Sequence, residues 1–189
     1  MKNNNLKKGL FLLFVALAIF SSACSASRAT KSSLYHNPII GKESKIYIMG
    51  IDGVYDKQQN SDHGSAIVLV AALRSLLITH GFESYVGKTL DLEKAILEAS
   101  TMQCNYVLRA TVIEWEKNAP PWSGKPDSYG LSLELYTVPN GNIVGFATHR
   151  VVGPKWTGFR HHPDRFIPEA ADHSLSKIFR WSPMIFADQ

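Results

Sequence analysis

The sequence predicts an α/β fold in which helices pack on a mixed sheet that ends in a three-stranded antiparallel meander. Between residues 45 and 105, short strand-like runs alternate with longer helix-like runs. From Tyr106 to Val152, three consecutive segments alternate their side chains with a period of two. That period is typical of strands with one buried face. The predicted order is therefore β-α-β-α-β-β-β-α, an α/β sandwich.

The first predicted strand, Lys45 to Ile51, is apolar on both sides of its alternation, as a central strand would be. After a polar stretch, Ala66 to His80 forms the most apolar helix of the chain. We expect Ser65 to cap the amino end of this helix, because a serine hydroxyl accepts a hydrogen bond from an otherwise unpaired helix amide. Gly81 is expected to end it.

Glu83 to Gly87 is predicted to be a short strand, and a second helix is expected to begin at Thr89 or Asp91. Apolar residues recur along that helix at positions i, i+3, i+4 and i+7, which gives it one apolar stripe. The stripe consists of Leu92, Ala95, Ile96, Ala99 and Met102.

The meander is predicted over Tyr106 to Trp115, Tyr129 to Val138 and Ile143 to Val152, with a tight reversal at Pro139 to Asn142. The apolar face of the meander must be covered by another structural element. Pro168 is well placed as the first residue of a third helix. The apolar stripe of that helix comprises Ala171, Leu175, Ile178 and Phe179.

The amino-terminal segment has the organisation of an export signal: a positive stretch, an apolar run from Gly9 to Phe20, and small residues up to Ala23. The apolar run is shorter than the ~20 residues that span a bilayer. An uncleaved membrane anchor and ordinary secretory cleavage nearby are the alternatives. Residues 1–23 are predicted to be a signal peptide, residues 24–44 a lipidated terminus and flexible tether, and residues 45–189 a single periplasmic domain.

Ser21 to Cys24 resembles the lipobox of bacterial lipoproteins, although Ser21 stands where leucine is usual. The resemblance implies that Cys24 becomes the first residue and carries three acyl chains, enough for stable anchoring. Ser25 follows the cysteine, and this resembles lipoproteins that are sorted to the outer membrane. We therefore expect the chain to be anchored there through Cys24 and to face the periplasm.

Net charge gives no reason to expect a nucleic-acid partner. The chain has a formal charge of +4, but three of its 20 basic residues lie before Cys24, where no acidic residue occurs. The remaining 17 basic residues nearly balance the 16 acidic ones, which leaves +1. The basic isoelectric point thus belongs to the targeting segment.

Two segments carry a more specific resemblance: Tyr106 to Trp115 (YVLRATVIEW) and Trp122 to Asp127 (WSGKPD). They resemble a bacterial lipoprotein family called domain of unknown function 4823, over residues 45–179. That family name implies no activity. The element order is also similar, at the level of fold, to periplasmic domains of the curli-secretion lipoprotein and the penicillin-binding-protein activator lipoproteins.

No catalytic constellation or cofactor motif is legible in the sequence. Adjacent residues of an extended chain point to opposite sides, so His161 and His162 rarely chelate one ion together. His162 with Asp164 could do so, and His149 is nearby in the sequence. A zinc site usually needs three or four ligands. A solvated loop is the favoured interpretation, and no metal site is predicted.

Three other candidates for chemistry also have simpler explanations. Cys104 opens an apolar strand, where an unpaired cysteine is usually buried. Ser65 follows a glycine, but Ile67 stands where a nucleophile elbow has its second glycine. Glu114 and Glu116 share a strand face at ~6 to 7 Å, near the separation of glycosidase carboxylates. An envelope hydrolase acting on cell-wall glycan through either glutamate is therefore the alternative to a non-catalytic binding or assembly module.

Three of the four tryptophans flank connections at one end of the predicted meander: Trp115, Trp122 and Trp156. Antiparallel pairing brings those connections to one edge, opposite the Asn140–Gly141 turn. Neighbouring prolines stiffen the loops, which lowers the entropy lost on binding. Because indoles are usually well buried, a satellite hydrophobic cluster that holds a loop down is the favoured interpretation. The alternative hypothesis is that these three indoles bind an envelope protein or glycan.

Overall fold

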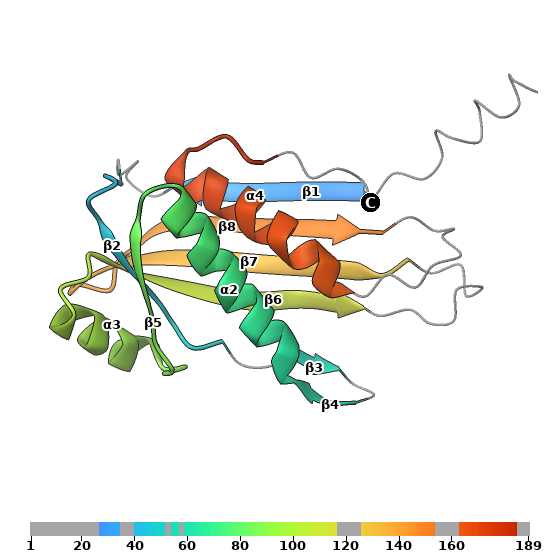
Figure 1. Ribbon diagram of the computed structural model, residues 1–189, viewed down its shortest axis with the longest axis horizontal. Helices are drawn as coiled ribbons and strands as arrows, with labels where there is room; N and C mark the ends of the chain where they lie inside the picture. The colour runs from blue at the N-terminus through green and yellow to red at the C-terminus, as the bar shows by residue number, and fades with distance from the viewer. Residues whose placement is uncertain are drawn as a thin grey trace, which may run out of the picture.

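The computed structural model describes residues 27–34, 40–51, 54–56, 59–116, 126–153 and 163–184. The main element of the fold is a six-stranded sheet (Figure 1). The strands, in spatial order, are β1 (Ser27–Leu34), β8 (Ile143–Val152), β7 (Ser128–Thr137), β6 (Tyr106–Glu116), β2 (Lys45–Ile48) and β5 (Glu83–Val86).

The sheet is mixed, as the sequence predicts. β2 pairs in parallel with both β5 and β6, whereas β6, β7, β8 and β1 pair antiparallel in succession. Three helices pack on it: α2 (His63–Thr79), α3 (Leu92–Thr101) and α4 (Ile167–Phe179). From β2 onward the main elements follow the predicted order. The additional elements are a short ribbon, β3 (Val54–Asp56) with β4 (Gln59–Asp62), and a 3-10 turn, η2 (Pro163–Phe166).

The helices cover the two faces of the sheet unequally. α2 and α4 lie side by side on one face (Figure 1), and α3 packs against β6. Because side chains alternate along a strand, Ile46 and Ile48 join the larger core under α2 and α4, whereas Tyr47 joins the smaller core with Ala95 and Ala99 of α3. The larger core also holds Leu131, Leu133 and Leu135.

Two helix ends follow the predicted chemistry, and Pro168 lies one residue after the start of α4. Asp91 caps α3, since its carboxylate accepts a hydrogen bond of 3.0 Å from the Lys94 amide. Gly81 follows α2 with a φ of +87°, a conformation that glycine adopts without strain.

The predicted cap at Ser65 is wrong. β4 leads directly into α2, so the helix begins at His63, and Ser65 lies inside its first turn. The Ser65 hydroxyl is buried and has no hydrogen-bond partner among the residues that the structure describes.

The segment predicted to be a tether also needs correction, because residues 27–34 form strand β1 along the free edge of β8. An open strand edge presents unpaired amides and carbonyls to any extended chain. Backbone pairing needs no hydrophobic periodicity, so the polar composition of this segment concealed the strand. None of the helices in the described ranges has the length and apolar composition of a membrane-spanning helix.

Candidate functional site

The most concentrated group of ionisable side chains that the structure describes lies where β1, β8 and α4 meet. Every second residue of β8 faces α4. This row includes Gly145, Ala147 and Val151, which are buried. His149 is the polar member of the row and is 1% exposed. The imidazole of His149 is therefore buried between β8 and α4.

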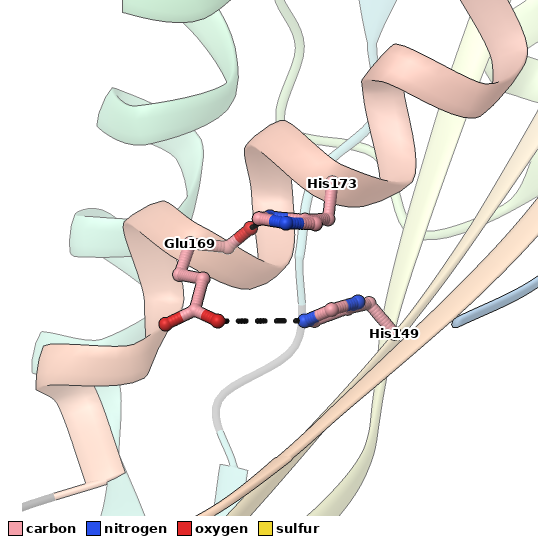
Figure 2. Close-up of side chains that lie close together, drawn as sticks. All are labelled: His149, Glu169 and His173. Atoms are coloured by element: carbon pink, nitrogen blue, oxygen red, sulfur yellow. Dashed lines mark hydrogen bonds and ion pairs between the residues drawn. The ribbon is translucent and has the colours of Figure 1, made fainter. Parts of the chain in front are cut away.

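Two residues of α4 meet this histidine. Glu169 and His173 are four residues apart and so lie one above the other on the same helix face. Figure 2 shows both side chains on the side of α4 that faces His149. Glu169 is 6% exposed. A carboxylate is almost never buried to this extent unless it has a charged partner.

The geometry joins the three side chains. His149 Nε2 lies 3.8 Å from Glu169 Oε1, the contact dashed in Figure 2. The imidazole rings of His149 and His173 are stacked, with centroids 4.6 Å apart and an angle of 27° between their planes. His173 Nδ1 donates to the backbone carbonyl of Glu169 at 3.0 Å, because a carbonyl can only accept.

A fourth residue comes from β1. Arg28 is paired in register with Val151, which places both side chains on the face covered by α4. Its guanidinium holds the Glu169 carboxylate with both arms: Nε donates to Oε1, and Nη2 donates to Oε2 at 3.3 Å. A two-pronged contact of this kind is the strong form of the arginine–carboxylate pair.

These neighbours determine the charge of Glu169. Burial by itself would raise the pKa of the carboxyl group, but the contacts with His149 and Arg28 outweigh burial and lower its pKa to about 2. Glu169 is consequently an anion at every physiological pH. It is suited to holding a cation in place and unsuited to donating a proton.

The same group is the one among the described residues that could hold a metal ion. His149, Glu169 and His173 each offer a ligand atom, and these atoms lie within 4.8 Å of one another. Arg28 already supplies a positive charge to the carboxylate, however, so a divalent ion would have to compete with the guanidinium. Stacked rings also do not direct their lone pairs to one point. The geometry favours an ion-pair cluster that ties β1 to α4.

The residues predicted for partner binding are only partly placed. Trp115 is the penultimate residue of β6, is half-buried, and packs its ring edge-on against Tyr129 with centroids 5.8 Å apart. Cys24, Trp122 and Trp156 lie outside the described residues, as do His161 and His162. Their predicted roles stay predictions.

The predicted hydrolase carboxylates show no feature of a proton donor. Arg150 binds Glu114 through Nε at 2.5 Å and Nη2 at 2.6 Å. The hydrogen bonds from Arg150 lower the pKa of Glu114, whereas a general acid needs a raised pKa. Glu116 is exposed at the end of β6. Glu114 is thus not in the environment of a protonated glycosidase acid.

Cys104 is a buried free thiol, as the sequence predicts, and burial raises its pKa. A raised pKa keeps the group as an unreactive thiol at neutral pH.

Sequence reasoning missed three members of the cluster. Glu169 and His173 stand at i and i+4 on a predicted helix, a spacing that could have drawn attention to them. Arg28 had no such signal, because nothing in residues 27–34 indicates which of their side chains face inward.

No protein-family model matches this chain, and no curated protein matches it in sequence. Membership of domain of unknown function 4823 therefore stays a prediction.

Solved structures show where the fold occurs. PelC from Paraburkholderia phytofirmans, solved as a dodecamer, is similar to this chain with a TM-score of 0.60 and 20% identity, over 80% of this chain and 97% of PelC. A single-residue variant of that PelC, also a dodecamer, gives a TM-score of 0.58 and 19% identity, over 79% and 98% of the two chains. Lipoprotein GNA1162 from Neisseria meningitidis reaches a TM-score of only 0.41 at 12% identity, over 58% and 83%. The likeness to PelC shows a shared fold.

Proposed function

We propose that this chain is a lipid-anchored module of a bacterial cell envelope that binds or assembles other envelope components without catalysing a reaction. Anchoring is through Cys24, at the outer membrane, with the domain facing the periplasm. The observation that carries the proposal is the fold, which this chain shares with PelC over 97% of PelC, a protein solved as a dodecamer. A domain with this fold can serve as one subunit of a larger assembly.

The side chains support the non-catalytic part of this proposal. The buried carboxylate of Glu169 is held by Arg28, and the carboxylate of Glu114 is held by Arg150. The pKa of each carboxyl group is lowered in these contacts. Both groups are used to hold elements together, so neither supplies the acid that glycan hydrolysis requires.

The proposed anchor is tested at Cys24. A Cys24→Ser chain, expressed in a Gram-negative host, is expected to accumulate as a precursor without lipid mass in intact-protein mass spectrometry. The wild-type chain is expected to carry acyl chains on Cys24 and to fractionate with the outer membrane. A processed Cys24→Ser chain that still fractionates with the membrane would refute lipidation.

The proposed contact surface is the end of the sheet that carries Trp115, together with the neighbouring segments that contain Trp122 and Trp156. Photo-crosslinking in intact cells, followed by mass spectrometry, is expected to capture further copies of this chain or another envelope component. Trp122→Ala should abolish that crosslink with little change in melting temperature. Crosslinking that survives Trp122→Ala, with a large loss of stability, would give these indoles a structural role.

Trp181 is the matched control for that experiment. Its ring stacks on His80 and Phe179, and its Nε1 donates to Asp172 at 3.1 Å. Trp181→Ala is therefore expected to lower the melting temperature and to leave the crosslink in place.

A further inference from the structure

The side of α2 that faces away from the sheet is apolar. Ile67 is 70% exposed and Ile78 is 54% exposed, and Ala71 lies between them on the same side of the helix. Arg74 is the one lysine, arginine or acidic residue in α2. A helix that is apolar on all sides is usually buried on all sides. The exposed side of α2 therefore has the composition of a contact surface.

The side chains in the middle of this stripe are small. Ala71 and Ser75 are exposed between the two isoleucines, Ile67 and Ile78. The isoleucines are about 16 Å apart along the helix axis, at 1.5 Å per residue. Small side chains allow a second helix to approach closely, so that a large apolar side chain of that helix packs between the isoleucines.

The outward side of α3 has the complementary composition. Leu97 in this helix is 70% exposed, and Leu90 just before the helix is 54% exposed. Glu93 lies one helical turn before Leu97 and is also exposed. α3 and its cap Asp91 contain three acidic residues and one lysine, whereas α2 contains one arginine and no acidic residue. The two outward surfaces are thus both partly apolar and are opposite in charge.

The spacings on the two helices agree when the helices are antiparallel and Arg74 lies opposite Glu93. Leu97 follows Glu93 by four residues, and Ala71 precedes Arg74 by three, so Leu97 then lies opposite Ala71. At 1.5 Å per residue these two offsets differ by only about 1.5 Å. Neither Arg74 nor Glu93 forms an ion pair with another residue that the structure describes. Each charge can therefore be paired by the other.

A single chain cannot bring these two surfaces together. α2 packs in the larger core with Ile46, and α3 packs in the smaller core with Tyr47. Neighbouring residues of a strand face opposite sides of the sheet, so the outward sides of α2 and α3 point in opposite directions. A contact between them joins two copies of the chain. It also leaves one unused surface of each kind on the resulting pair.

We propose that copies of this chain associate head to tail, with α2 of one copy packed against α3 of the next and Arg74 paired with Glu93. The inference rests on the proposed assembly function and names a second copy as the partner. A head-to-tail contact repeats, so it closes into a ring or continues as a filament. Antiparallel pairing of α2 with itself would place both Arg74 side chains on the same side of the contact, where like charges repel. The contact does not use the end of the sheet that carries Trp115, so it is compatible with the contact proposed there.

Disulfide crosslinking of the full-length chain in membranes of the expressing host tests this contact. Ala71→Cys and Leu97→Cys are combined in a Cys104→Ser background, which by itself gives the background signal. The proposed packing brings the two thiols within disulfide distance, about 4.4 to 6.8 Å between Cα atoms. After oxidation the chain with both cysteines is expected to give a ladder of dimers, trimers and larger species. Ala71→Cys with Lys31→Cys is the matched control and is expected to give no ladder, since Lys31 is exposed on β1 at the other edge of the sheet.

Charge reversal gives a second measurement on the same chain. Arg74→Glu and Glu93→Arg are each expected to reduce the ladder several-fold, and the two together are expected to restore it. Restoration separates the ion pair from a loss of α3 stability, because an arginine in the first turn of a helix is unfavourable in both cases. A ladder that neither single reversal weakens, or that the double reversal fails to restore, would overturn the proposed pairing.

The crosslinked species also distinguish this arrangement from the others. Separate chains that carry Ala71→Cys or Leu97→Cys, made in the same cells, are expected to give dimers and nothing larger. Dimers from chains with Ala71→Cys alone would show a symmetric α2 contact and overturn the inference. Absence of the ladder while the Trp122 photo-crosslink persists would overturn this inference alone. Absence of both would overturn the proposed assembly function with it.

Discussion

Glu169 is a buried carboxylate whose negative charge is compensated by Arg28, a residue near the other end of the sequence. Arg28 lies 141 positions earlier in the chain, and the two meet only because β1 pairs with β8. Removing one partner of such a pair leaves a charge with too little compensation, which costs more than the pair itself contributes.

The lowered pKa of Glu169 predicts how stability depends on pH. The folded state holds this proton more weakly than the unfolded state, so the contribution is complete above about pH 4.5 and is lost as the pH falls toward 2. At 1.36 kcal/mol per unit it is at most about 3 kcal/mol. Urea unfolding across this range is expected to show the loss.

Glu169→Gln is expected to flatten that part of the profile, and Glu43→Gln serves as the control because Glu43 is exposed. Parallel pH profiles for wild type and Glu169→Gln would contradict the assignment of the acid-labile contribution to this carboxyl group.

Glu114 belongs to an ion pair at the rim of the sheet. Its partner Arg150 has a side chain that is 52% exposed, and pairs of this kind contribute about 0 to 1 kcal/mol. We predict that Glu114→Gln combined with Glu116→Gln still complements a deletion strain, with a melting temperature lowered only slightly. Loss of complementation by a folded double variant would favour the hydrolase.

Zinc distinguishes an ion-pair cluster from a metal site at His149, Glu169 and His173. Because Arg28 already neutralises Glu169, calorimetric titration of the soluble chain with zinc is expected to give the same heat for wild type and His173→Gln. Heat that disappears in His173→Gln would establish a metal site in the cluster. Heat that disappears in His162→Gln would place an ion in the segment that contains His161 and His162.

Among the elements, β1 shows how an edge strand can form without a sequence pattern. It contributes backbone pairing along all eight of its residues, together with the Arg28 contact, and its partner β8 would otherwise be the edge of the sheet. Pairing with β1 protects from water the β8 amides that point toward that edge of the sheet.

A chain that begins at residue 40 is therefore expected to exchange its β8 amides faster than a chain that begins at residue 27, in hydrogen–deuterium exchange followed by mass spectrometry. Arg28→Ala in the longer chain isolates the side-chain contact. We expect it to lower the unfolding free energy by about 1 to 3 kcal/mol while the β8 amides stay protected. Equal exchange in both chain lengths would show that β1 does not form in solution.

On the scale of the whole molecule, the sheet has two unlike ends. One end receives the start of β1, and the other carries the turn whose Gly141 has a φ of +68°.

Local sequence patterns were sufficient to predict the fold class, the order of the main elements from β2 onward, and the glycine and aspartate at the ends of α2 and α3, Gly81 and Asp91. Periodicity, capping and turn chemistry are local properties that neighbouring residues fix. The buried state of Cys104 followed in the same way, from its place at the start of an apolar strand.

Three features depend on long-range contacts: residues 27–34 form a strand, Ser65 lies inside α2, and four side chains form one cluster, namely Arg28, His149, Glu169 and His173. β1 exists because β8 offers an unpaired edge, and the position of that edge depends on how the whole sheet is ordered. The charge cluster depends in turn on β1, since only the pairing of Arg28 with Val151 brings the guanidinium to Glu169. Contacts between residues so far apart in sequence leave no local pattern from which they could be predicted.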